Sequence, residues 1–204
     1  MFKPSVFIAV ITLALAGAGC SEAPKAEKAP PKNLEPLTGR QAFQQMYPPA
    51  RAWAADAQPL QIKSVPLESV KAAPGKSGAW QVTFISPSRS RAKIFTWSAI
   101  EAEGNLHQGV FSGPDESWSG SHGQEQPFFA QAIKTDSDEA YETAVKKSAE
   151  YLKKNPAKLV TFIAEYTNRF PNAAWRVIWG ESVNSSDYSV FVDASTGEFL
   201  ERTH

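Results

Sequence analysis

The chain has 204 residues, and its 21 Lys and Arg are balanced by 21 Asp and Glu, so its formal net charge is zero. This balance argues against a nucleic-acid-binding protein, because such proteins carry an excess of basic residues that neutralises phosphates. The single cysteine excludes an internal disulfide framework and any zinc or iron–sulfur site built on several cysteines. Six Trp and twelve Phe are enough bulky apolar material for a hydrophobic core.

The first 19 residues have the pattern of a secretory signal peptide. Lys3 provides a positive start, and residues 5–19 carry no charge. A helix over this uncharged run would extend about 22 Å, which is shorter than the roughly 30 Å hydrocarbon core of a membrane. The run therefore predicts an exported protein rather than one anchored by a spanning helix.

The run Leu15-Ala-Gly-Ala-Gly-Cys20 resembles the lipobox of bacterial lipoproteins. The resemblance implies that the Cys20 thiol receives a diacylglyceryl group, that the signal is cut before Cys20 and that the new amino terminus is acylated. Two or three acyl chains, at about 0.8 kcal/mol for each buried methylene, would hold the chain on a membrane. Ser21 follows Cys20, and in the family's sorting pattern this resembles a signal for the outer membrane. The expected location is therefore the outer membrane, facing the periplasm. The alternative is an ordinary cleaved signal with an incidental cysteine.

A flexible tether is predicted next, so that residues 20–37 comprise the lipidated Cys20 and a spacer. Residues 21–37 contain four Pro, three Lys, three Glu and no aromatic residue. Such a segment cannot bury enough apolar surface to offset the entropy lost on ordering. We expect it to separate a folded body from the membrane surface.

A first helix is predicted at the start of the body. From Gly39 to Trp53, apolar residues recur at helical spacing. Pro48 and Pro49 are expected to kink or interrupt this helix, because proline lacks the N–H that the helix needs.

A second helix is predicted about 98 residues later. Asp136 or Ser137 is a good N-cap, and acidic residues follow in the first turn. Lysines occupy the far end, and Asn155-Pro156 is expected to stop the helix.

Each predicted helix is followed by strand-like segments in the same order, which indicates a duplication. The pattern Ala-Trp-x-Val-x-aromatic begins at Ala79 in the first half and at Ala174 in the second. A polar turn and a further strand follow in both halves, and then turns at Gly104 and Gly197. Fourth strands are expected at residues 106–111 and 199–200. A chance alignment of short apolar strands is the alternative.

The second half also resembles PepSY-type domains. The resemblance lies in the Trp-x-Val strand at Trp175 and in the later run Val192-Asp-Ala-Ser-Thr-Gly197, ahead of Phe199 and Leu200. It covers residues 136–204, and reaches the first half only through the duplication. It implies a cystatin-like fold in an extracytoplasmic protein, with inhibitory or partner-binding roles and no catalytic residues to transfer.

The predicted fold class is therefore α+β, with two tandem helix-plus-antiparallel-sheet units of PepSY/cystatin-like type docked together. The units are residues 38–111 and 136–204, and residues 112–135 connect them. Residues 38–111 carry a net charge of +4, and residues 112–204 carry −5. This separation is either incidental or favours docking of the halves.

The connecting segment contains the candidate contact residues. It is rich in Gly and Ser, yet it holds Trp118, His122 and the pair Phe128-Phe129. Trp118 either covers the seam between the halves or is an exposed contact for a partner. Ser121, His122 and Asp115 could be drawn as a hydrolytic set, but they crowd into one loop without a rigid scaffold.

These patterns predict a non-catalytic lipoprotein that binds a protein or peptide, including as an inhibitor. We expect no catalytic residues, no metal site, no cofactor and no nucleic-acid partner, and contact with the membrane through the lipid on Cys20. The alternatives are a structural lipoprotein for envelope assembly or maintenance and an envelope hydrolase.

Overall fold

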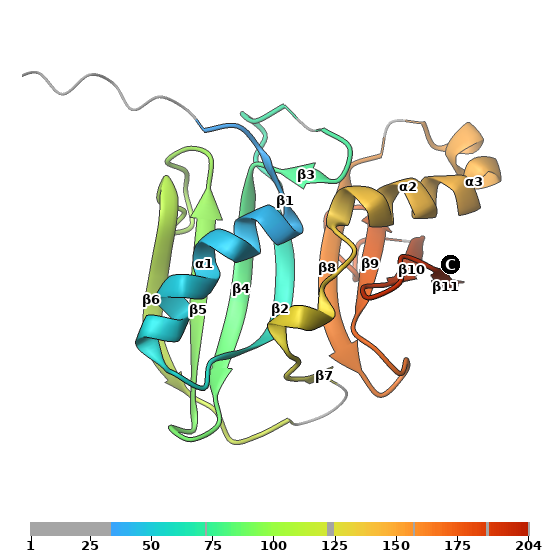
Figure 1. The fold of residues 1–204 in the computed structure, drawn as a ribbon. Coiled ribbons are helices and arrows are strands. Elements are labelled where there is room, and N and C mark those ends of the chain that lie inside the picture. The colour runs from blue at the N-terminus through green and yellow to red at the C-terminus, as the bar shows by residue number, and fades with distance from the viewer. Residues whose placement is uncertain (1–33, 72, 122–124, 157, 187, 204) are drawn as a thin grey trace, which may run out of the picture. The chain divides into compact units, whose positions relative to one another are not determined.

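A computed structural model describes residues 34–71, 73–121, 125–156, 158–186 and 188–203 (Figure 1). The predicted signal, Cys20, most of the tether and His122 lie outside the described residues. The described chain is of the α+β class, as predicted, with a large antiparallel sheet and few helices.

The sheet runs through both halves of the chain. Each half adds four strands to it as an antiparallel meander. In spatial order the strands are β11 (Phe199–Thr203), β10 (Ser189–Asp193), β9 (Ala174–Trp179), β8 (Val160–Thr167), β2 (Gln58–Val65), β4 (Ala79–Ser86), β5 (Arg91–Ser98) and β6 (Gly109–Ser117). The short strand β7 (Glu125–Gln126) pairs with the end of β8.

The first helix, α1 (Gly39–Trp53), packs on β2, β4 and β5. It continues through Pro48 and Pro49, so the expected interruption is wrong. Both prolines are exposed, and so are Gln44 and Gln45, whose carbonyls lose their usual N–H donors. Water can hydrate these carbonyls, and the buried face of the helix, which is made of other residues, is kept.

The predicted second helix is divided in two. Helix α2 (Ser137–Lys147) has Asp136 as its N-cap, as predicted, and packs on β9 and β10. Ser148 ends α2, and α3 (Ala149–Lys154) follows with Asn155 as its C-cap. The break occurs at a buried position, where the Tyr188 hydroxyl donates to Ser148 Oγ at 3.1 Å. Figure 1 shows α1 and α2 on the same side of the sheet.

Two predicted boundaries shift. Strand β6 begins at Gly109 and extends to Ser117, so residues 112–117 belong to a strand and not to a connecting segment. At the other end, β1 (Leu37–Thr38) pairs with β3 (Lys76–Ser77), and the Leu34 N–H donates to the Ala99 carbonyl at 2.9 Å. The last residues of the expected tether are therefore hydrogen-bonded to the fold.

The two halves meet where β2 pairs with β8. This pairing is short: Gln61, Ile62 and Lys63 lie opposite Glu165, Ala164 and Ile163. We call this junction the seam. It makes one continuous sheet of strands that are far apart in the sequence.

On the helix side of the seam, Trp80 and Trp175 occupy corresponding positions. Both are fully buried, and their rings meet edge to face with centroids 6.2 Å apart. The Trp80 indole N–H donates to the Leu37 carbonyl, and that of Trp175 to the Thr135 carbonyl, each at 2.9 Å. Each tryptophan thus fixes the backbone just before a helix, while the pair fills the core above the seam.

The N-termini of the two helices share one carboxylate. Asp136 accepts hydrogen bonds from the Ser137 N–H of α2 at 2.7 Å and from the Arg40 N–H of α1 at 2.8 Å. The Thr38 hydroxyl also donates to Asp136, at 2.6 Å. Gly39 permits this close approach, since a Cβ there would lie only 2.4 Å from the Trp175 ring.

Candidate binding surfaces

Trp118, one of the candidate contact residues, lies just beyond β6. Its backbone N–H donates to the Ser90 carbonyl in the β4–β5 turn at 3.0 Å, and its side chain is half-buried. This hydrogen bond stays within the first half, and His122 is outside the described residues. The inter-half or partner role of these two residues stays a prediction.

Phe128 and Phe129 lie beside the seam. Phe128 is 5% exposed, and its N–H donates to the carbonyl of Pro59 in β2 at 2.9 Å. Phe129 is 71% exposed, more than any other large hydrophobic residue in the described ranges. The two neighbours therefore differ: one is fixed in the core, and the other reaches into solvent.

Phe129 lines a small apolar cleft at the end of the sheet where β8 turns into β9. The cleft has a volume of about 200 Å³. Its walls are mostly aromatic, proline and alanine side chains: Pro127, Phe128, Phe129, Ala132, Tyr166, Pro171, Asn172 and Ala173. We call it the Phe129 cleft. Sequence reasoning identified the two phenylalanines but missed Tyr166 and Pro171, which reach the cleft only because β7 pairs with β8.

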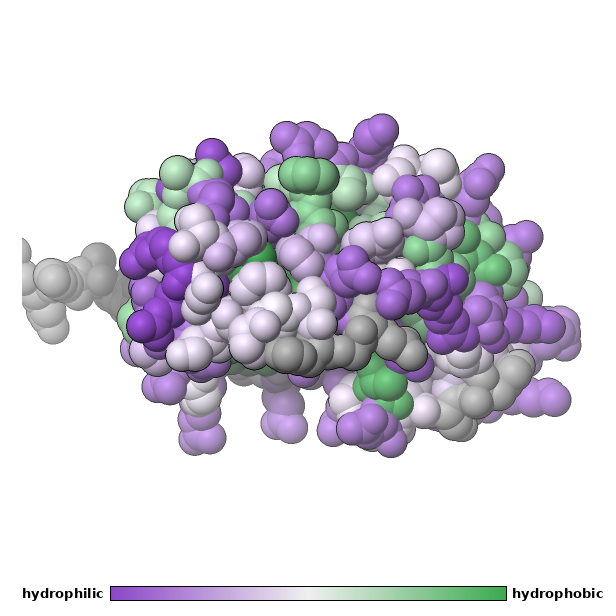
Figure 2. Space-filling model, turned by 90° about the horizontal axis from the view of Figure 1, so that it is seen from below, coloured by the Kyte–Doolittle hydropathy of each residue, from purple (hydrophilic) through white to green (hydrophobic). Residues whose placement is uncertain are grey.

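Figure 2 shows this end of the molecule, where hydrophobic side chains form small patches that hydrophilic ones separate. A surface of this kind does not match the large apolar area of an obligate oligomer interface.

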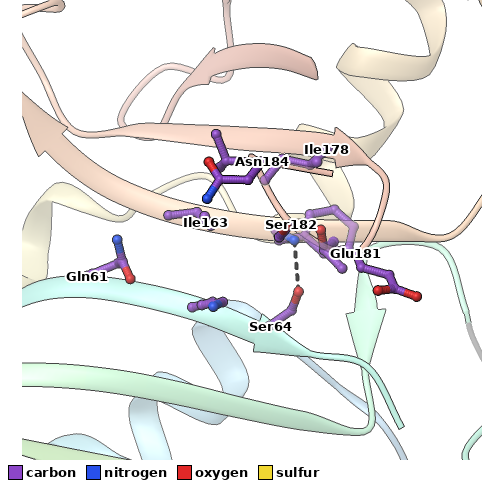
Figure 3. A pocket seen from close by; sticks show the side chains of 11 residues that line it. Gln61, Ser64, Ile163, Ile178, Glu181, Ser182 and Asn184 are labelled. Carbon is purple, nitrogen blue, oxygen red and sulfur yellow. Dashed lines mark hydrogen bonds between the residues drawn. The ribbon is translucent and has the colours of Figure 1, made fainter. Parts of the chain in front are cut away.

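A second hollow lies at the seam, where β2 and β8 diverge. Beyond their three paired residues, the Phe162 N–H donates to the Ser64 side chain at 2.8 Å instead of to a backbone carbonyl (Figure 3). The hollow measures about 200 Å³. Its walls are Gln61, Lys63, Ser64, Thr161, Phe162, Ile163, Ile178, Glu181, Ser182, Val183 and Asn184. Amides, hydroxyls, one ammonium and one carboxylate can hydrogen-bond a small polar group there.

The seam also holds a partly buried carboxylate, Glu165. Burial raises the pKa of Glu165, and the nearby charge of Glu125 raises it further. A hydrogen bond from the Gln61 amide at 3.1 Å and the charge of Arg176 act in the opposite direction but do not cancel the shift. The ionised form of Glu165 is therefore less favourable in the folded protein than in the unfolded chain.

Arg176, whose charge acts on Glu165, makes two further contacts. Its Nε donates to Ser189 Oγ at 2.9 Å, and its guanidinium lies 5.0 Å from the centre of the Phe191 ring. Burial lowers the pKa of Arg176, which the charge of Glu165 partly offsets. Neither Glu165 nor Arg176 was identified from the sequence, because their proximity depends on strand pairing.

The run that resembles PepSY domains forms a turn closed by Asp193. The carboxylate accepts the N–H groups of Ser195 and Thr196 at 2.7 and 2.9 Å, and the Asn172 amide at 3.0 Å. Burial alone would raise the pKa of Asp193, but these hydrogen bonds outweigh it and lower the pKa. Gly197 has a φ of +75°, as its place in the turn requires. These residues shape the turn.

The structure does not assemble the hypothetical hydrolytic set: Ser121 is exposed, His122 is outside the described residues, and Asp115 is held by other side chains. Asp115 accepts hydrogen bonds from Lys93 at 2.9 Å and Trp53 at 3.1 Å, and the bond from Lys93 is the main cause of its lowered pKa. Within the described ranges, no group of three or more His, Cys, Asp or Glu could hold a metal ion. None of the helices in these ranges is both long and apolar enough to cross a membrane.

The raised pKa of Glu165 predicts a pH dependence of stability. Because the folded state holds this proton more tightly than the unfolded state, the group adds to the free energy of unfolding as the pH falls from 7 towards its ordinary pKa of 4.5. We expect Glu165→Gln to have a higher Tm than the wild type at pH 7, with the difference shrinking towards pH 5. Thermal melts across this range measure it, with Glu181→Gln as an exposed control. A constant difference at all pH values would show that the charge of Glu165 carries no cost.

The sequence matches no protein-family model and no curated protein. The fold is similar to a solved crystal structure, that of a protein described as a "putative lipoprotein (CD1622)" from Clostridium difficile 630. The two chains are 11% identical, the alignment covers 84% of this chain and 98% of that chain, and the TM-score is 0.48.

Proposed function

We propose that this protein is an envelope lipoprotein, anchored through Cys20, whose folded body binds a protein or peptide without catalysis. The body is a tandem of two PepSY/cystatin-like units that function as one platform. The exposed Phe129 beside its apolar cleft is the observation that supports binding most directly. Inhibition of the bound partner is one form of this function.

The tandem arrangement is supported by contacts that correspond in the two halves. The helix N-caps, Thr38 and Asp136, are 98 residues apart, and each closes a capping box. Gly104 and Gly197 both have positive φ in the turn after the third strand of the meander. Helix caps and turns that recur at similar spacing favour duplication over a chance alignment of strands.

The binding role is supported by the contrast between Phe128 and Phe129. The buried Phe128 and its hydrogen bond to Pro59 hold the backbone at the cleft, so little entropy is lost when Phe129 is ordered by a partner. An aromatic side chain adds a large contact area at low conformational cost, which is why such residues dominate binding energy at protein interfaces.

The anchor is tested by fatty-acid labelling. Cells that express the full chain are grown with labelled palmitate, and we expect label on the wild-type protein and none on Cys20→Ser, because only the Cys20 thiol can take the diacylglyceryl group. Ser21→Ala serves as the matched control and should keep the label. Label on Cys20→Ser, or none on the wild type, would contradict the lipoprotein assignment.

The binding role is tested by photo-crosslinking at the Phe129 cleft. A benzophenone amino acid placed at position 129 should give a discrete adduct with an envelope protein, and one placed at Leu159, which is also exposed, should not. In a binding assay with that protein, Phe129→Ala should weaken affinity about tenfold or more. Identical adducts at both positions, or none at position 129, would instead favour a structural lipoprotein.

A further inference from the structure

Strand β6 is an open edge of the sheet. Its only strand partner in the described chain is β5, and Figure 1 shows no element beyond it. No hydrogen bond to the outward backbone groups of residues 109–117 is found among the described residues. An edge of this kind presents unpaired N–H and C=O groups to any extended chain of compatible geometry.

The edge carries exposed apolar side chains and a bulge that limits pairing. Val110 and Phe111 are 39% and 41% exposed. Gly113 and Pro114 together lie opposite Ile94 alone, which bends the strand. The bulge and the proline interrupt the regular ladder of backbone hydrogen bonds at residues 113–114, so an added strand can pair with residues 109–112 and continue past the bulge to face Glu116.

A hollow of about 530 Å³ lies next to this edge on the face of the sheet that bears no helix. Its walls combine apolar and polar groups with one charged residue: Gln81, Ile94, Thr96, Gly104, Asn105, Phe111, Ser112, Gly113, Pro114 and Glu116. We call it the edge hollow. Its volume is large enough to accept a bulky side chain from a strand that pairs with β6.

Charge and register define what such a strand must carry. Glu116 has no ion-pair partner within the described residues, whereas the adjacent Asp115 is already paired with Lys93. Phe111 and Glu116 lie opposite Thr96 and Ala92, which are four residues apart on β5 and about 13 Å apart at strand spacing. An added strand would therefore need an apolar residue opposite Phe111 and a basic residue opposite Glu116, about four positions apart on that strand.

Two arrangements that pair the whole of β6 with a second copy of the chain are unfavourable. Antiparallel pairing centred on the bulge would set Val110 and Phe111 of one copy against Glu116 and Asp115 of the other. Parallel pairing would set Glu116 against Glu116. Both arrangements place apolar groups or like charges opposite carboxylates, which is unfavourable across strands.

We propose that β6 binds an extended segment of a partner by strand addition, with an apolar side chain in the edge hollow and a Lys or Arg facing Glu116. This inference rests on the proposed binding function but concerns a different surface. The Phe129 cleft and the β6 edge can therefore fail separately.

The probe for this proposal is an acetylated nine-residue peptide of alternating Thr and Val, with Phe and Lys four positions apart on one face. Hydrogen exchange of the full-length protein, followed by mass spectrometry, should show slowing by about tenfold or more in residues 109–117 when the peptide is bound. Two further peptides keep the same side chains but are methylated at alternate backbone nitrogens, one in each of the two possible frames. Only the peptide whose methylated nitrogens face β6 should lose this protection. If one of the two methylated peptides loses protection and the other keeps it, the peptide binds through its backbone rather than through side-chain contact alone.

Variants separate the two parts of the site. Phe111→Ala should weaken peptide binding about tenfold, and Glu116→Gln about threefold. Phe129→Ala should leave the peptide affinity unchanged, which distinguishes this surface from the Phe129 cleft. Replacing the peptide's Lys by Glu gives the charge test without altering the protein.

Three results would overturn the proposal. The first is equal protection by the methylated peptides, and the second is no protection in residues 109–117 with the unmodified peptide. The third is slowed exchange of β6 with rising protein concentration and no peptide, which would assign the edge to a second copy.

Discussion

The buried carboxylate of Asp136 is the interaction on which the arrangement of the two halves depends. It is 6% exposed and accepts hydrogen bonds from the first turn of its own helix and from Thr38 and Arg40 in the other half. The N-terminal turn of a helix has unsatisfied N–H groups and a partial positive charge, so one anion between two such turns stabilises both. An uncompensated carboxylate at this depth would be costly, and the convergent donors remove that cost.

The shared cap positions everything at the seam. With the helix ends held together, Trp175 lies against Gly39 and Trp80, and β2 and β8 meet on the opposite side of the same core. The segment after β7 can then cross the seam. There the Phe128 N–H donates to the Pro59 carbonyl, and Phe129 is left at the surface. Glu165 is partly buried at the same junction. The Phe129 cleft is thus a product of how the halves join, whereas the edge hollow belongs to the first half alone.

Local features of the fold could be predicted from the sequence, and long-range pairings could not. The Asp136 cap, the Ala-Trp-x-Val strands and the turn at Gly197 depend on neighbouring residues, and they were found where expected. The course of α1 through Pro48 and Pro49 depends on which face is solvated, which the local pattern does not specify. The late start of β6 and the β2–β8 register depend on partners far along the chain. The same limit applies to the sites: Phe128 and Phe129 stand out by composition, whereas Tyr166, Glu165 and the edge at β6 acquire their roles only through pairing.

The most direct test of this account is native-state hydrogen exchange on Asp136→Ala, compared with the wild type and with the exposed α2 variant Glu142→Ala. We expect the opening free energies of amides in β4 and in β9 to fall together, by about 3 kcal/mol, because a cap shared by two helices is lost and its donors are left buried. Glu142→Ala should change neither by more than about 0.5 kcal/mol. A fall confined to β9, with β4 unchanged, would contradict the account, because it would show that the two halves hold their structure independently.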